Sequence, residues 1–99
     1  MLDLIIKNAK ICTSSDIFLS DIGIQDKQIV LLQKNIEQKS KETIDAKGRH
    51  VLPGGIDGHC HLDQPMKDGS VIADNFETGT KSAAFGGTTT VIPFAVQYK

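Results

Sequence analysis

The chain has 99 residues, of which 39% are hydrophobic and 23% are charged, as in an ordinary soluble globular protein. Eleven basic and twelve acidic residues give a formal net charge of −1, which argues against a nucleic-acid footprint or a cationic patch for a membrane surface. No apolar run approaches the roughly 18 residues of a membrane span, and the two cysteines are too few for a disulfide framework. We therefore expect a reduced, cytoplasmic protein without nucleic-acid or membrane partners.

The first fifty residues carry an alternating apolar pattern in three short stretches: Leu2, Leu4 and Ile6; Ile22 and Ile24; Ile29 and Leu31. A period of two is typical of half-buried strands. Asp26-Lys27, between two of these stretches, predicts a tight hairpin turn, and AKGR (46–49) predicts another. We expect a small antiparallel β unit.

The pattern changes near position 50. HVLPGGIDGHCHL (50–62) is an apolar segment punctuated by glycines, and it predicts a buried strand that ends near His61. The segment after it, DQPMKDGS (63–70), contains Pro, Gly and Asp and predicts a loop.

A helix is expected next, within ADNFETGTKSAAFGG (73–87). Asp74 and Glu77 have the spacing of a capping box, and Gly86-Gly87 predicts the carboxyl end. TTTVIPF (88–94) is rich in β-branched residues and predicts the next strand. Strand, helix and strand in this order favour a parallel sheet with a crossover helix. One such unit cannot cover both faces of its own sheet, so we expect a fragment of a larger protein.

His59 and His61 stand one residue apart at the end of the predicted strand. Because successive strand residues point to opposite faces, the two imidazoles share a face, with Cα atoms about 6.6 Å apart. Such a pair can bind one metal ion, or it can be a partly buried polar strand end. Catalytic zinc usually takes three protein ligands, and His50 is expected to be a solvent-exposed strand residue. Further ligands must then lie outside this sequence. Cys60 points the other way and is expected to be a small packing residue rather than a nucleophile.

Two stretches, VLPGGIDGHCHLDQP (51–65) and DNFETGTKSAAFGGTTTVIPFA (74–95), resemble the start of the dihydropyrimidinase and hydantoinase branch of the amidohydrolase superfamily. The resemblance implies an α/β fold, a (β/α)8 TIM barrel with a small β-sandwich domain. Residues 1–52 would belong to the sandwich, and residues 53–99 would begin the barrel. It also implies a cyclic amidase, which hydrolyses C–N bonds in dihydropyrimidines or 5-substituted hydantoins.

The same resemblance implies a centre of two divalent metal ions, usually zinc, bridged by a carboxylated lysine and a hydroxide. His59 and His61 match the H-x-H that ends the first barrel strand and binds the more buried ion. The lysine, two further histidines and a catalytic aspartate would come from strands beyond Lys99. The fragment alone is therefore expected to be inactive, and its full-length parent is expected to be a homotetramer that acts on a small cyclic amide.

Three positions in the following loop bear on the substrate. Dihydroorotases and allantoinases resemble this stretch but typically have H-x-H-x-R, and Asp63 stands here in place of the arginine. Since an acid would repel the carboxylate of dihydroorotate, a neutral ring is favoured. Gln64 and Met66 match lid positions and are expected to contact the substrate, with simple loop packing as the alternative for Met66.

Two other classes stay open. One is an allantoinase- or dihydroorotase-type cyclic amidase. The other is a non-catalytic dihydropyrimidinase-related scaffold protein, although such proteins typically lack the metal-binding histidines.

Overall fold

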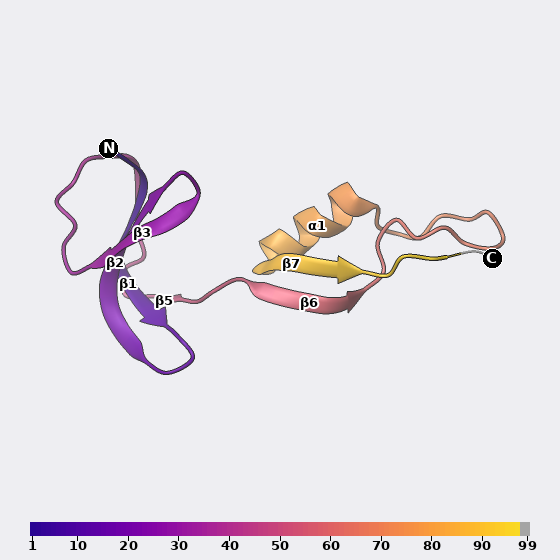
Figure 1. Ribbon diagram of the computed structural model, residues 1–99, viewed down its shortest axis with the longest axis horizontal. Helices are drawn as coiled ribbons and strands as arrows, with labels where there is room; N and C mark the ends of the chain where they lie inside the picture. The colour runs from indigo at the N-terminus through magenta and orange to yellow at the C-terminus, as the bar shows by residue number, and fades with distance from the viewer. Residues whose placement is uncertain (98–99) are drawn as a thin grey trace. The chain divides into compact units, whose positions relative to one another are not determined.

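The computed structural model describes residues 1–97, in two compact units, Met1–Pro53 and Gly54–Lys99. The first unit contains β1 (Leu2–Cys12), β2 (Ile17–Gln25), β3 (Gln28–Gln33), β4 (Ser40–Asp45) and β5 (His50–Val51). The second contains β6 (Gly55–Cys60), α1 (Phe76–Phe85) and β7 (Thr88–Pro93) (Figure 1). Within residues 1–97 no helix has the length and apolar character needed to cross a membrane.

The first unit is a single five-stranded sheet in the order β3-β2-β1-β4, with β5 also paired to β1. β1 pairs with β2, and β2 with β3, in antiparallel fashion, as predicted. The expectation of a wholly antiparallel unit is wrong, because β4 and β5 both run parallel to β1. Alternation of apolar residues specifies which face of a strand is buried, but it carries no information on strand direction.

Both predicted turns are present. Asp26 and Lys27 have φ values of 51° and 63° and join β2 to β3 as a two-residue hairpin of the I′ kind. Lys47 and Gly48 are likewise left-handed, at 53° and 76°. The amide of Gly48 donates to the carbonyl of Asn8, which ties this turn to β1.

The apolar core of the first unit forms two clusters of buried side chains. One holds Ala9, Ile11, Ile22 and Ala46, and the other holds Leu2, Ile5 and Ile36. Between Ile6 and Ala9 the register of β1 against β2 shifts by one residue, which is the signature of a β-bulge. The bulge lets β1 contribute to both clusters.

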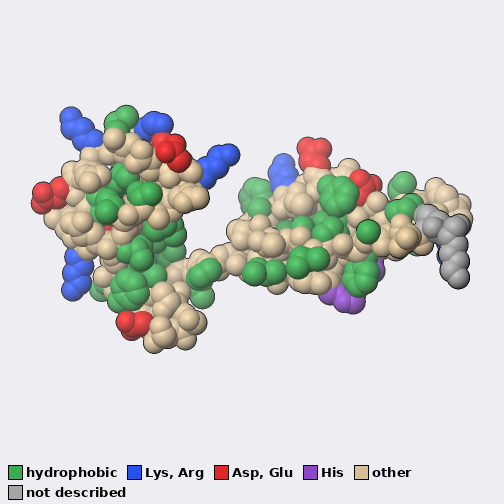
Figure 2. Space-filling model, viewed as in Figure 1, with side chains coloured by type: hydrophobic (Ala, Val, Ile, Leu, Met, Phe, Trp, Pro, Cys, Tyr) green, Lys and Arg blue, Asp and Glu red, His purple; other side chains and the backbone are tan. Residues whose placement is uncertain are grey.

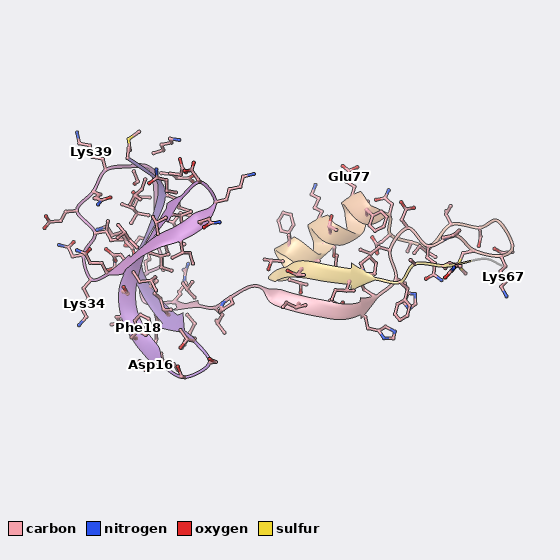
Figure 3. The ribbon with its side chains drawn as sticks, in the orientation of Figure 1. Asp16, Phe18, Lys34, Lys39, Lys67 and Glu77 are labelled. Atoms are coloured by element: carbon pink, nitrogen blue, oxygen red, sulfur yellow. The ribbon has the colours of Figure 1, made fainter. Side chains whose placement is uncertain are left out.

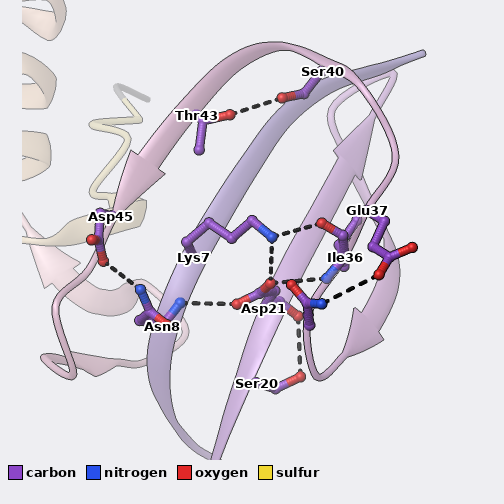
Figure 4. Close-up of polar contacts among 10 residues, drawn as sticks. Lys7, Asn8, Ser20, Asp21, Ile36, Glu37, Ser40, Thr43 and Asp45 are labelled. Carbon is purple, nitrogen blue, oxygen red and sulfur yellow. Dashed lines mark hydrogen bonds and ion pairs between the residues drawn. The ribbon is translucent and has the colours of Figure 1, made fainter.

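An ion pair between half-buried Lys7 and buried Asp21 joins β1, β2 and the chain that leads to β4 (Figure 4). The carboxylate of Asp21 is 3.0 Å from Lys7 Nζ and accepts hydrogen bonds of 2.9 Å from the amides of Asn8 and Ile36. Lys7 Nζ also donates to the carbonyl of Ile36 at 2.6 Å. Burial alone would raise the pKa of Asp21, but the hydrogen bonds from these two amides and from Lys7 outweigh burial and lower it. The ionised carboxylate of Asp21 therefore links β1, β2 and the segment before β4.

The second unit is a strand–helix–strand element, as predicted. β6 and β7 pair in parallel, and α1 packs against β7 on one side of this two-stranded sheet (Figure 1). The prediction that the first of these strands is buried is wrong, since Ile56 in β6 is 71% exposed. Two strands and one helix do not supply enough surface to enclose a parallel sheet. Hydrophobic side chains are accordingly open on the surface (Figure 2).

The N-cap of the helix lies one residue later than predicted. Asn75, not Asp74, is the N-cap: its Oδ1 accepts from the amide of Thr78 at 2.8 Å, and Thr78 Oγ1 accepts from the amide of Asn75 at 3.1 Å. Asp74 is held outside the helix because its carbonyl accepts from the amide of Asp63. Glu77 consequently projects from α1 instead of closing the capping box (Figure 3).

The carboxyl end of α1 agrees with the sequence. Gly86 is the C-cap, and Gly87 follows with a φ of 87°, a left-handed conformation that only glycine adopts at no steric cost.

Replacing Gly54 by alanine is expected to destabilise the chain by about 1–3 kcal/mol, as overpacking does. An added Cβ would lie 2.6 Å from the Cβ of Thr89, which no side-chain rotation relieves, and it would also meet Oγ1 and Cγ2 of Thr89. Urea unfolding measures the effect. Gly58→Ala is the matched control in the same segment, because a Cβ there meets nothing within 4 Å. Equal stability of the two variants would contradict this packing.

Candidate metal centre

The two histidines lie together at the carboxyl end of β6. His59 is the last residue but one of β6, and His61 is the first residue after β6. Their ring centroids are 5.6 Å apart, with the planes at 67°. Two imidazoles that bind one zinc ion have ring centres about 5 Å apart, given Zn–N bonds of about 2.0–2.1 Å. The pair is thus spaced to provide two nitrogen ligands to one ion. Histidine side chains are visible at the surface of the molecule (Figure 2).

A local irregularity of β6 places the pair. Between Asp57 and Cys60 the register against β7 shifts, so that three steps on β6 match two steps on β7. The carboxylate of Asp57 accepts from the amide of His59 at 3.1 Å, which fixes the backbone inside this bulge. Bulges frequently reorient side chains beside functional sites.

Phe94 lies against both imidazoles. Its ring centroid is 4.6 Å from that of His59 in an edge-to-face arrangement, and 4.9 Å from that of His61 with the planes only 6° apart. The amide of Phe94 donates to the carbonyl of Cys60 at 3.0 Å, which holds the aromatic residue beside the pair. Sequence reasoning treated Phe94 only as strand filling. The available signal was that parallel strands end at the same edge, so the residue after β7 meets the residues that end β6.

Gln64 is bonded to the second histidine. Its Oε1 lies 2.6 Å from His61 Nδ1. An amide oxygen can only accept, so the contact is a hydrogen bond in the tautomer of His61 that carries its proton on Nδ1. Gln64 was predicted to contact substrate, and the structure places it half-buried beside the imidazole.

The loop after the pair encloses a pocket of about 620 Å³. The loop is held in shape by a β-bridge between Pro65 and Val71 and by a hydrogen bond from the amide of Gly69 to the carbonyl of Met66. Gln64 and Met66 both line the pocket, together with Asp63. The two loop residues singled out from the sequence therefore face one cavity, and Gln64 also contacts His61.

The remaining candidates lie elsewhere or play other parts. His50 is exposed on β5, as expected, and belongs to the first unit. Cys60 is half-buried, and Asp63 is exposed with a left-handed φ of 48°. Among residues 1–97 no three His, Cys, Asp or Glu side chains are close enough together to hold a metal ion. Within the described residues, His59 and His61 are the two histidines at this edge.

Comparison with known proteins gives consistent matches, although no family model matches the chain. It is 50% identical over 95 residues to a D-hydantoinase of Geobacillus stearothermophilus, covering 96% of this chain and 20% of that protein. It is 39% identical over 99 residues to Dihydropyrimidinase 2 of Caenorhabditis elegans, covering 99% of this chain and 19% of that protein. An allantoinase of Salmonella choleraesuis (strain SC-B67) is 39% identical over 90 residues, which are 91% of this chain and 19% of that protein.

Solved structures agree. A crystal structure of D-hydantoinase matches with a TM-score of 0.91 and 49% identity, covering 100% of this chain and 21% of that one. Dihydropyrimidinase from Brevibacillus agri NCHU1002 matches with a TM-score of 0.89 and 43% identity, again over 100% of this chain and 21% of the other.

The chain spans about a fifth of the length of the curated relatives it matches. Over its own length the chain is thus similar in sequence and in fold to part of proteins named D-hydantoinase and dihydropyrimidinase.

Proposed function

We propose that this chain is the amino-terminal part of a metal-dependent hydrolase that opens dihydropyrimidines or 5-substituted hydantoins at a C–N bond. The observation that carries the proposal is the histidine pair. His59 and His61 lie side by side, 5.6 Å apart, in a chain that is 50% identical to the start of a D-hydantoinase. Two adjacent imidazoles favour a metal-binding enzyme over a scaffold protein without a metal centre.

In this proposal the full centre holds two divalent metal ions, zinc in the first instance, bridged by a carboxylated lysine from a later strand. His59 and His61 would hold the more buried ion through their ring nitrogens. When bound, the metal ions lower the pKa of a shared water and polarise the amide carbonyl. Phe94 stacks on His61 and meets His59 edge-to-face, which supports a fixed plane for each imidazole.

The proposed architecture follows from the same likeness. Residues 53–99 would be the start of a (β/α)8 barrel and residues 1–52 part of a β-sandwich. The pair would then lie at the carboxyl end of a barrel strand, where enzymes of that fold build their active sites. The whole protein would be a cytoplasmic homotetramer.

Asp63 supports a neutral substrate. It lines the loop pocket that Gln64 also lines, where a negative side chain disfavours an anionic ring. Gln64 and Met66 would contribute to the substrate wall from the same loop. The pocket therefore favours dihydrouracil or a hydantoin over dihydroorotate.

The test is hydrolysis of three rings by the polypeptide that carries this chain: dihydrouracil, a 5-substituted hydantoin and dihydroorotate. We expect kcat/KM for one of the neutral rings to exceed that for dihydroorotate by about tenfold or more, equivalent to about 1.4 kcal/mol. A chelator should abolish turnover and zinc should restore it. Preferential opening of dihydroorotate would contradict the role of Asp63. A folded protein with neither metal nor turnover would instead be a scaffold.

A further inference from the structure

The loop after β6 places one amide side chain directly on a proposed metal ligand. Gln64 Oε1 lies 2.6 Å from His61 Nδ1, three residues along the chain. Gln64 is half-buried and His61 is exposed, so the contact lies at the surface and owes its geometry to the short, three-residue separation. Its position is also fixed from the other side, because Pro65 pairs with Val71 across the loop.

From this contact we infer that Gln64 is a positioning residue for the metal centre: it holds His61 in the Nδ1–H tautomer and directs Nε2 at the ion. This inference rests on the proposed function. Ligating histidines commonly donate their second ring N–H to a carboxylate, carbonyl or water, which fixes both the tautomer and the ring direction. A side-chain amide oxygen provides the same acceptor. The residue expected to form part of the substrate lid thus acts through His61.

Two contacts together determine the orientation of the His61 imidazole. Phe94 stacks on His61 with the planes 6° apart and so sets the plane of the imidazole. Stacking does not distinguish one ring nitrogen from the other, since a flipped ring presents the same face to Phe94. The hydrogen bond from Nδ1 to Gln64 makes that distinction.

The test compares the tautomer of His61 and the zinc affinity in the polypeptide that carries this chain with those of two variants. Gln64→Leu keeps the bulk and removes the acceptor, whereas Gln64→Glu keeps an acceptor oxygen at the same reach. Long-range ¹H–¹⁵N NMR at about pH 8.5, where an ordinary imidazole is neutral, reports which ring nitrogen carries the proton. His59 is the internal control, because Gln64 is not bonded to it. Zinc affinity is then measured by titration on the same samples.

We expect His61 to be the Nδ1–H tautomer in the wild type and in Gln64→Glu, and to lose that preference in Gln64→Leu while the signals of His59 keep their tautomer. Zinc affinity should fall about 10-fold or more in Gln64→Leu, as is typical when an outer hydrogen-bond partner of a metal ligand is removed. Gln64→Glu should bind zinc at least as tightly as the wild type.

Two results would overturn the inference alone: a wild-type His61 protonated at Nε2, or zinc binding of Gln64→Leu equal to that of the wild type. A wild-type chain in which zinc reaches neither His59 nor His61 would overturn the proposed function together with this inference. The tautomer is measured without metal, so the two failures are distinguishable.

Discussion

Replacing Asp21 by alanine is expected to lower the free energy of unfolding by about 3 kcal/mol or more. The substitution leaves Lys7 with one polar contact, the carbonyl of Ile36. It also deprives the amides of Asn8 and Ile36 of their acceptor. Asp21 is only 5% exposed, so water does not readily replace these bonds, and unpaired buried donors are costly. Urea unfolding followed by circular dichroism measures the loss.

Asp45 offers a matched control. Its carboxylate also accepts two hydrogen bonds, from Asn8 Nδ2 and from the amide of Lys47, but it is exposed. Asp45→Ala should therefore lower the free energy of unfolding much less than Asp21→Ala does, because solvent screens and replaces exposed polar contacts. Comparable losses for the two variants would show that burial of Asp21 does not organise the first unit.

The same carboxylate makes stability depend on pH. Because the folded state lowers the pKa of Asp21, its ionised form contributes stability above the ordinary pKa of about 3.9. That contribution is lost as the pH falls through the lower pKa of the folded state. The stability difference between the wild type and Asp21→Asn should consequently be constant near neutral pH and shrink below about pH 4. A difference that grows in acid would have the wrong sign.

Removing either histidine of the pair is expected to abolish function in the polypeptide that carries this chain. His59→Ala or His61→Ala removes one of two adjacent nitrogen donors, so metal content should fall and ring opening should decrease by at least about 100-fold. Loss of a mere outer partner already costs about 10–100-fold. Metal analysis and hydantoin hydrolysis on the same preparations measure both effects.

His50→Ala is the control, because His50 is exposed on β5 in the other unit. It should leave metal content unchanged and turnover within about twofold, since surface substitutions have small effects. If His50→Ala removed metal while His61→Ala did not, the assignment of the pair would be wrong.

Local features of the fold were predictable from the sequence, and long-range ones were not. The hairpin at Asp26-Lys27 and the stop at Gly86-Gly87 depend on backbone conformations that neighbouring residues determine. The parallel course of β4 beside β1 depends on how residues 34–39 cross the sheet, which no short pattern encodes. The helix cap moved from Asp74 to Asn75 because a distant amide, that of Asp63, binds the carbonyl of Asp74.

The candidate site shows the same division. The one-residue spacing of His59 and His61 on a strand was enough to place them on one side. Phe94 joins them only because β7 ends beside β6, which requires the parallel pairing to be known. The contact of Gln64 with His61 depends on the course of an irregular loop, and its residue type alone favoured a different role.

The central claim is that His59 and His61 together bind a metal ion, and a zinc titration of the polypeptide that carries this chain, followed by long-range ¹H–¹⁵N NMR of its histidine rings, tests it most directly. The account predicts that the ring-nitrogen signals of His59 and His61 move together, in the same proportion to added zinc, while those of His50 remain in place. Equal movement of all three histidines, or movement of His50 alone, would contradict it.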